Sequence, residues 1–255
     1  MNYFPLIDTR MSCQFIHDQV KKTNTKKISF VEKIQQADAI LVGGGDGYML
    51  QSMRTYHDQN LPFIGYNCGT LWFLLNNITS IQQLPSDSRD LIFITSKLID
   101  VTARFNDGST QQDFFINDLI IGNHIKDYFH FDIQTAEQNF NITGTWLVVS
   151  TSIWSTAYAL NLWAPLIPLS SELLSIVWIA SKPFNYHFTP SKTIKIQAQG
   201  RAVVQASCDG EGKTFENIHS LTIQASEKYV TIWFLPSEDF NTRRIHLANT
   251  KLQKT

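Results

Sequence analysis

The segment that decides the fold reads Ala39-Ile40-Leu41-Val42-Gly43-Gly44-Gly45-Asp46-Gly47. Its first four residues form a short apolar run that is typical of a buried strand, and four of the next five are glycine. Good helix formers follow in residues 48–56. The segment therefore predicts a strand, a glycine turn and a helix, with the turn at the N-terminus of the helix.

This turn predicts a site for phosphate. Consecutive backbone N–H groups at a helix N-terminus, unhindered by side chains, favour anions. The turn is not a Rossmann fingerprint, because no glycine stands three residues after Gly45, and it is not a P-loop, because no Gly-Lys-Ser/Thr follows. Asp46 would repel phosphate unless it held a metal ion or accepted a proton from an attacking hydroxyl, and both roles belong to phosphoryl transfer. The alternative is a turn that needs positive φ, with Asp46 as a solvated cap.

The flanking pattern predicts two domains. Asp8 or Thr9 could cap a helix that runs towards Lys22, and Ser29 with Glu32 forms a capping box for a second helix. With a buried strand at residues 62–66, residues 1–97 predict an α/β domain with parallel strands. Apolar residues then alternate with polar ones, so residues 98–235 predict a mostly antiparallel β domain, and residues 236–255 form a C-terminal segment.

Composition narrows the class of partner. The 21 basic and 22 acidic side chains give no positive field for nucleic acid or a membrane, so small molecules or proteins are favoured. Three cysteines without CxxC spacing argue against a disulfide framework and for a reducing compartment, and we expect a cytoplasmic protein without a signal peptide. Arg243-Arg244 could meet a phosphate, but a solvated face or a packed tail is favoured.

Several segments resemble the NAD kinase family, in the family's order and over nearly the whole chain. The family's GGDG turn matches Gly44-Gly45-Asp46-Gly47, and its Asn-Glu/Asp pair matches Asn117-Asp118. Without the family, Asn117-Asp118 could equally be a turn or a cap after a strand. The further matching segments are Asn67–Leu74, Val149-Ser150-Thr151, Ser155-Thr156-Ala157-Tyr158, Pro165-Leu166-Ile167 and Ser207-Cys208-Asp209-Gly210.

The resemblance implies transfer of a phosphoryl group from ATP or polyphosphate to the 2′-hydroxyl of the adenosine ribose of NAD. Asp46 would act on that hydroxyl as a base or through Mg²⁺ or another divalent cation, behind a phosphate site of Gly44, Gly45, Gly47 and Tyr48. The resemblance also implies a sandwich-like second domain, a C-terminal segment that returns to the first domain, and a homodimer or homotetramer. The dinucleotide would bind to Asn117, Asp118, Thr156, Ala157 and Tyr158.

The chain departs from the family at positions that the resemblance places around the dinucleotide. Tryptophan replaces glycine at four positions, and Thr145 replaces an aspartate that reaches the nicotinamide end. Tryptophans there could fill the cleft, stack on a ring of the ligand, or pack away from it. The alternative function is therefore a nucleotide-binding NAD kinase-like protein with altered specificity or no turnover. The candidates for shaping the pocket are Trp72, Thr145, Trp146, Trp154, Asn161, Trp163 and Asp209.

Overall fold

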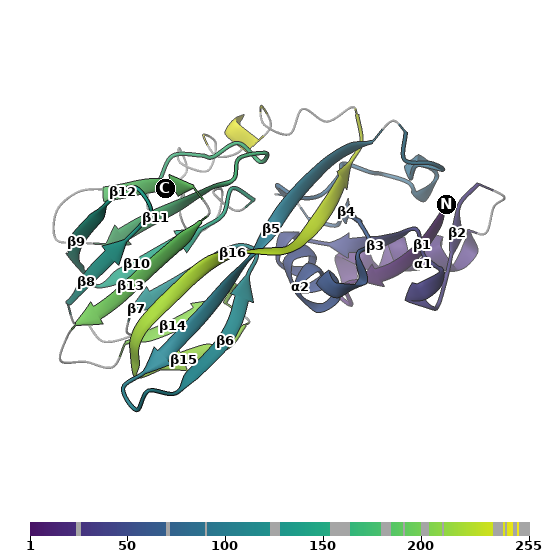
Figure 1. The fold of residues 1–255 in the computed structure, drawn as a ribbon. Coiled ribbons are helices and arrows are strands. Elements are labelled where there is room, and N and C mark those ends of the chain that lie inside the picture. Colours follow the sequence, from purple (N-terminus) through teal and green to yellow (C-terminus); the bar gives the residue numbers. More distant parts are fainter. Residues whose placement is uncertain are drawn as a thin grey trace. The chain divides into compact units, whose positions relative to one another are not determined.

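The structure is a computed structural model of the chain and forms two units (Figure 1). One unit comprises Met1–Ser96 and Lys228–Thr255, and the other comprises Lys97–Glu227. The chain passes between them inside two long strands, β5 (Ile92–Phe105) and β16 (Ile218–Phe234). The described residues are 1–23, 27–69, 72–89, 91–122, 128–153, 164–179, 185–190, 192–199, 204–210, 212–236, 242, 244–246 and 249.

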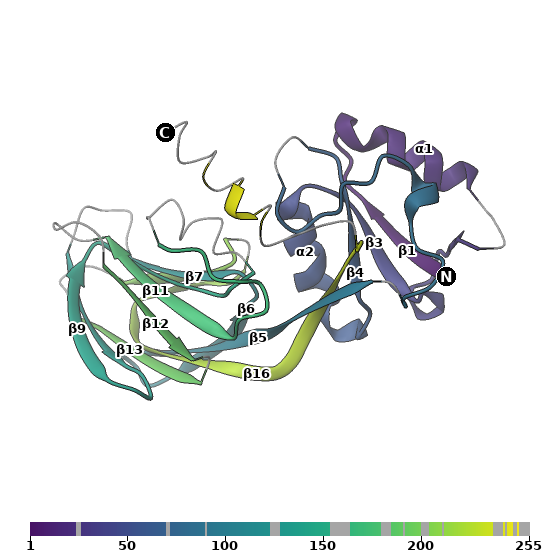
Figure 2. The same ribbon diagram turned by 90° about the horizontal axis from the view of Figure 1, so that it is seen from above.

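The first unit is an α/β sheet of parallel strands in the order β2-β1-β3-β4, with β16 added in parallel beside β4. All six residues of β3 are buried, as expected for an inner strand of a parallel sheet. Figure 2 shows α1 and α2 on opposite faces of this sheet. The elements are β1 (Asn2–Ile7), η1 (Met11–Cys13), α1 (Gln14–Lys22), β2 (Ser29–Phe30), η2 (Ile34–Gln36), β3 (Ala39–Gly44), α2 (Asp46–Tyr56), η3 (His57–Gln59), β4 (Phe63–Asn67) and η4 (Ile81–Gln83).

The second unit is a β-sandwich, because one apolar cluster joins residues of two sheets, among them Ile196 and Leu221 from one and Val149 and Ile176 from the other. One sheet has the order β16-β13-β8-β9 with β5 and β6 attached, and the other the order β12-β11-β10-β7-β14-β15. The fold class predicted from the sequence is confirmed. The remaining strands are β6 (Thr110–Phe115), β7 (Asp118–Gly122), β8 (Phe129–Gln134), β9 (Asn139–Gly144), β10 (Trp146–Ser150), β11 (Leu173–Ile179), β12 (Asn185–Pro190), β13 (Thr193–Gln199), β14 (Gln205–Cys208) and β15 (Thr214–Glu216).

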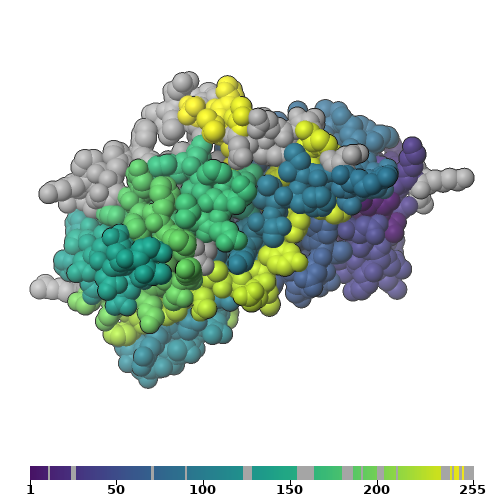
Figure 3. Space-filling model, turned by 45° about the horizontal axis from the view of Figure 1, so that its top comes forward, coloured from purple at the N-terminus to yellow at the C-terminus, as the bar shows by residue number. Residues whose placement is uncertain are grey.

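The chain's return to the first unit begins at Lys228, inside β16, whereas the resemblance implied a return by residues 236–255. Buried Asn76 ties this return to the first unit: its amide nitrogen donates to the Trp233 carbonyl at 3.1 Å, and its Oδ1 accepts from the Leu235 N–H at 2.8 Å. The segment before β5 belongs to the same unit, and Figure 3 shows blue atoms beside the purple atoms of the N-terminal residues. The Tyr3 hydroxyl donates there to the Pro85 carbonyl at 2.7 Å.

Two local predictions are wrong. The capping box at Ser29 starts no helix, because Ser29 pairs with Asn2 in β2 and a 3₁₀ turn follows at Ile34–Gln36. The expectation of no disulfide framework also fails for one pair: Cys13 and Cys68 form a disulfide, with their Cα atoms 5.4 Å apart. They are 55 residues apart in sequence, so only the folded chain reveals that they meet. Cys208 is buried and takes no part in this disulfide. Within the described residues, no helix is long and apolar enough to cross a membrane.

Candidate active site

The glycine turn lies where the sequence predicts it, between β3 and α2. Gly45 is the N-cap of α2, with φ −109° and ψ 178°, and has no side chain to accept hydrogen bonds from the first helical turn. A Cβ on Gly44 would stand 2.9 Å from Cδ1 of Tyr48, so the Tyr48 ring packs directly on this backbone. A Cβ on Gly47 would meet nothing within 4 Å. The start of α2 is therefore open on the Gly47 side, as an anion site requires.

Backbone N–H groups hold the carboxylate of Asp46 in place. Its Oδ2 accepts from Phe73 N–H at 2.8 Å and its Oδ1 from Leu74 N–H at 2.9 Å. Both donors lie in the segment after β4, whose start is tied to the turn because Cys68 N–H donates to the Gly44 carbonyl at 2.9 Å. A carboxylate oxygen can accept more than one hydrogen bond, so these two N–H groups do not by themselves exhaust what the carboxylate can accept.

Arg244 is buried in the same unit, with 3% of its surface exposed. Burial lowers the pKa of its guanidinium to about 10, and the negative charge of nearby Asp46 opposes that shift. The C-terminal segment thus supplies a cation close to Asp46. A solvated face is excluded for Arg244, while its neighbour Arg243 lies outside the described residues.

A second set of predicted residues meets in the β-sandwich around Asp209. The Asp209 carboxylate accepts three backbone hydrogen bonds, from Ile116 N–H at 2.9 Å, Asn117 N–H at 2.7 Å and Asp118 N–H at 3.1 Å. Asp209 itself has φ +52°, a left-handed conformation that is uncommon outside glycine. Asp209 therefore fixes the backbone of the Asn117-Asp118 pair.

Both side chains of this pair are buried, and Asn117 carries a hydrogen-bond acceptor without a partner among the described residues. Oδ1 of Asn117 is buried and accepts no hydrogen bond from any residue that the structure describes. Burial raises the pKa of Asp118 to about 7, and the charge of Asp209 adds to the rise. An orphaned acceptor beside a carboxyl that holds its proton near neutral pH can recognise the N–H and O–H groups of a nucleoside.

The predicted Val149-Ser150-Thr151 segment packs against the same pair. Thr151 Oγ1 donates to the Ile116 carbonyl at 2.6 Å, and Thr151 N–H donates to the Asn117 carbonyl at 2.9 Å. Sequence segments that matched the family separately are therefore neighbours in the fold. The rest of the predicted dinucleotide set, Thr156, Ala157 and Tyr158, lies outside the described residues, as do Trp154, Asn161 and Trp163.

Two of the tryptophans that stand where the family has glycine lie among the described residues. Trp72 is half-buried in the first unit, and Trp146 is half-buried in the second. Trp146 pairs with Gly122 across β10 and β7, and a Cβ on Gly122 would stand 2.6 Å from the Trp146 ring. The indole therefore lies on the glycine backbone of the neighbouring strand. Thr145 donates its N–H to the Ile179 carbonyl at 2.9 Å. These contacts explain how Trp146 and Thr145 pack against neighbouring strands. The role of both residues at the ligand stays a prediction.

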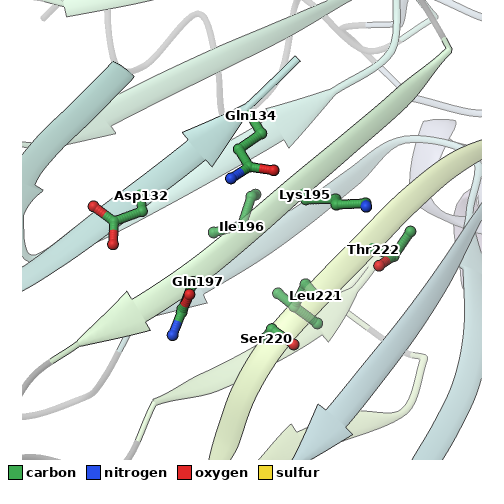
Figure 4. Close-up of a pocket in the computed structure, with 8 residues that line it drawn as sticks. All are labelled: Asp132, Gln134, Lys195, Ile196, Gln197, Ser220, Leu221 and Thr222. Carbon is green, nitrogen blue, oxygen red and sulfur yellow. The ribbon is translucent and has the colours of Figure 1, made fainter. Parts of the chain in front are cut away.

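A pocket of about 200 Å³ lies on the second unit (Figure 4). Two rows of paired side chains from β8, β13 and β16 form its polar surface, Gln134 with Lys195 and Thr222, and Asp132 with Gln197 and Ser220. None of the predicted site residues lines this pocket. Its polar lining follows from strand geometry, because successive side chains of a strand point to opposite faces of the sheet and the polar ones lie on the outer face.

Solved structures identify the class of fold. A crystal structure of an NAD kinase from Archaeoglobus fulgidus in complex with ATP aligns with a TM-score of 0.71 and 16% identity, over 98% of this chain and 99% of that one. Yeast NADH kinase complexed with NADH aligns with a TM-score of 0.76 and 16% identity, over 96% and 86%. The protein therefore has the two-unit fold of the NAD kinases.

Sequence comparison points to the same family. The ATP-NAD kinase N-terminal domain matches residues 4–92, which include the glycine turn and Asp46. The NAD kinase of Rickettsia felis is 27% identical over 80% of this chain and 86% of its own length. The NAD kinase of Rickettsia prowazekii is 25% identical over 87% and 93%. Together these matches support membership of the NAD kinase family.

Proposed function

We propose that this protein is an NAD kinase that makes NADP from NAD and ATP. The 2′-hydroxyl oxygen of the adenosine ribose attacks the γ-phosphorus, a new P–O bond forms, and the bond to the β-phosphate oxygen breaks to release ADP. The hydroxyl proton passes to Asp46. The observation that carries the proposal is the fixed position of Asp46 at the start of α2, beside an open glycine turn, in a chain of this family.

The chain's own residues divide the work between positioning and proton transfer. The N–H groups at the start of α2 bind phosphate oxygens, and Gly44, Gly45, Gly47 and Tyr48 shape that surface. Asn117 and Asp118 recognise the nucleoside through the orphaned Oδ1 and the carboxyl group. Such positioning accounts for most of the catalysis in phosphoryl transfer, because the reaction needs little covalent chemistry from the protein.

Magnesium fits the donor set at Asp46. The described residues hold no group of three His, Cys, Asp or Glu side chains, but Mg²⁺ is commonly bound by one or two carboxylates together with substrate phosphates. Asp46, at the start of α2 beside the glycine turn, could supply that carboxylate. When bound, a divalent cation would neutralise charge on the phosphates.

The finer features of the proposal are the cytoplasmic location, the homodimer or homotetramer, and the use of Thr156, Ala157 and Tyr158 at the dinucleotide. They rest on the sequence and its resemblance to the family. Light scattering behind a size-exclusion column measures the oligomer directly.

The proposal is tested by an assay for NADP formation with ATP or polyphosphate as donor, paired with calorimetric titrations of NAD, NADP and ATP. We expect NADP to form with ATP. Binding of NAD and ATP without NADP would favour the alternative, a nucleotide-binding protein without turnover. The departures at Thr145 and the tryptophans are the observations that motivate this alternative.

A further inference from the structure

The turn that follows β1 lies directly beside the glycine turn. Ile7 is the register partner of Gly43, and the next residue, Asp8, donates its N–H to the Gly43 carbonyl at 2.8 Å. The carboxyl ends of β1 and β3 are therefore adjacent, and residues 8–10 leave the sheet at the start of α2. Ligands of open α/β sheets bind outside this end of the strands.

Asp8 holds Arg10 in a defined position there. The Asp8 side chain is 12% exposed, and its carboxylate accepts the Arg10 N–H at 3.0 Å and the Arg10 Nε–H at 2.7 Å. Burial alone would raise the pKa of Asp8, but the hydrogen bonds and charge of Arg10 keep that pKa below its ordinary value. The Arg10 side chain is 63% exposed. A guanidinium has five N–H donors, so donors remain beyond those directed at Asp8.

The guanidinium extends over the start of α2, because Nη2 of Arg10 lies 3.5 Å from the place of a Cβ on Gly45. A cation at this position faces the positive end of the helix dipole, where anions are favoured and cations are not. A phosphate between the guanidinium and the helix N–H groups would bind to both at once.

We propose that Arg10 binds phosphate oxygens of the nucleotide at the glycine turn, and that Asp8 positions it. The proposal rests on the proposed function, since it assigns a further residue to the same site. The phosphates could be those of ATP or the diphosphate of NAD. Arginine suits either, because its planar fork binds two phosphate oxygens together.

The chain contains a matched control. Asp87 and Arg89 form the same Asp-x-Arg turn, with Arg89 N–H donating to Asp87 at 3.0 Å. Hydrogen bonds from Arg89 lower the pKa of Asp87 to about 2, and the N-terminal ammonium adds a smaller effect, so this turn lies near the start of β1. Asp8 and Arg10 follow the other end of that strand. A change at Arg89 therefore tests how the loss of a surface ion pair away from the glycine turn affects nucleotide binding.

The experiment compares Arg10→Gln with Arg89→Gln by calorimetric titration with ATP and, separately, with NAD. A charge-assisted hydrogen bond is worth about 1.5–3 kcal/mol, so Arg10→Gln should weaken binding of one nucleotide about tenfold or more. Arg89→Gln should change either Kd less than about twofold. Thermal melts check folding. If Arg10→Gln is unfolded, Arg10→Lys is titrated in its place and should also weaken binding, because lysine lacks the planar fork.

The role of Asp8 is tested by a double-variant cycle. Asp8→Asn should raise the KM for the affected nucleotide with little change in kcat, and should add nothing in the Arg10→Gln background. Wild-type binding with no difference between Arg10→Gln and Arg89→Gln would overturn the Arg10 assignment alone. A wild-type protein that binds neither nucleotide would overturn the proposed function as well.

Discussion

The carboxylate of Asp46 accepts a hydrogen bond from the backbone N–H of Phe73 at 2.8 Å. Its other oxygen accepts from Leu74 N–H at 2.9 Å, so both donors come from one segment that is distant in sequence. The carboxylate that the reaction needs is therefore also the group that fixes residues 73–74. A change at Asp46 acts on the chemistry and on this local structure together.

Asp46→Asn should reduce NADP formation by at least about 100-fold, because an amide cannot take the hydroxyl proton. The variant should also lose about 1–3 kcal/mol of stability. Its side-chain NH₂ group replaces one carboxylate oxygen and cannot accept the hydrogen bond that a backbone N–H donates to that oxygen. Urea denaturation measures the second effect, and Asp58→Asn, at an exposed carboxylate in η3, serves as the control. A variant that keeps more than about a tenth of the activity would remove Asp46 from the mechanism.

The raised pKa of Asp118, about 7, predicts a pH dependence of stability. Between its ordinary value of 3.8 and about 7, the folded protein holds a proton that the unfolded chain has released. This group therefore makes the free energy of unfolding fall as pH rises through that window. Asp118→Asn should remove this contribution. The free energy of unfolding of the variant should therefore rise relative to that of the wild type between pH 4 and pH 7. Parallel stability curves across that range would contradict the assignment.

The disulfide between Cys13 and Cys68 predicts sensitivity to reductant. It closes a long loop of the unfolded chain, and opening such a loop typically costs about 2–4 kcal/mol of stability. Dithiothreitol should lower the free energy of unfolding of the wild type and leave that of Cys68→Ser unchanged. An equal response in both proteins would show that the reductant acts elsewhere, for example at Cys208.

Local patterns predict the parts of the fold that local physics determines. The buried run before Gly43 and the glycines after it specify strand, turn and helix without help from distant residues. The capping box at Ser29 fails because pairing with Asn2 in the sheet outweighs a local preference of about 1 kcal/mol. A capping box does form at Ser80, where no strand competes.

The contacts that build the site are less predictable, because they join residues far apart in sequence. Asp209 matches the family pattern, but its hydrogen bonds to backbone N–H groups 91 to 93 residues away depend on no side-chain type at the donors. Arg10 carries no motif, and its place beside Gly45 follows from the pairing of β1 with β3. A basic residue three positions after the end of the first strand is the signal that could have found it.

The tryptophans carry the last prediction: at least two of Trp72, Trp146, Trp154 and Trp163 border the dinucleotide site and alter its nicotinamide end. The motivation is positional, because the resemblance places all four where the family has glycine around one ligand. Bound NAD should then quench tryptophan emission. If the rings fill the cleft, the double change Trp154→Gly, Trp163→Gly should raise NAD affinity. If the rings stack on the ligand, the double change should weaken NAD binding by roughly 1–3 kcal/mol.

Trp233 supplies the control for lost emission, because it is buried in the first unit and its ring packs edge-on against Phe93. Trp233→Phe therefore removes a tryptophan that the prediction does not place at the ligand. Unchanged NAD affinity together with unquenched emission would show that the tryptophans pack away from the site.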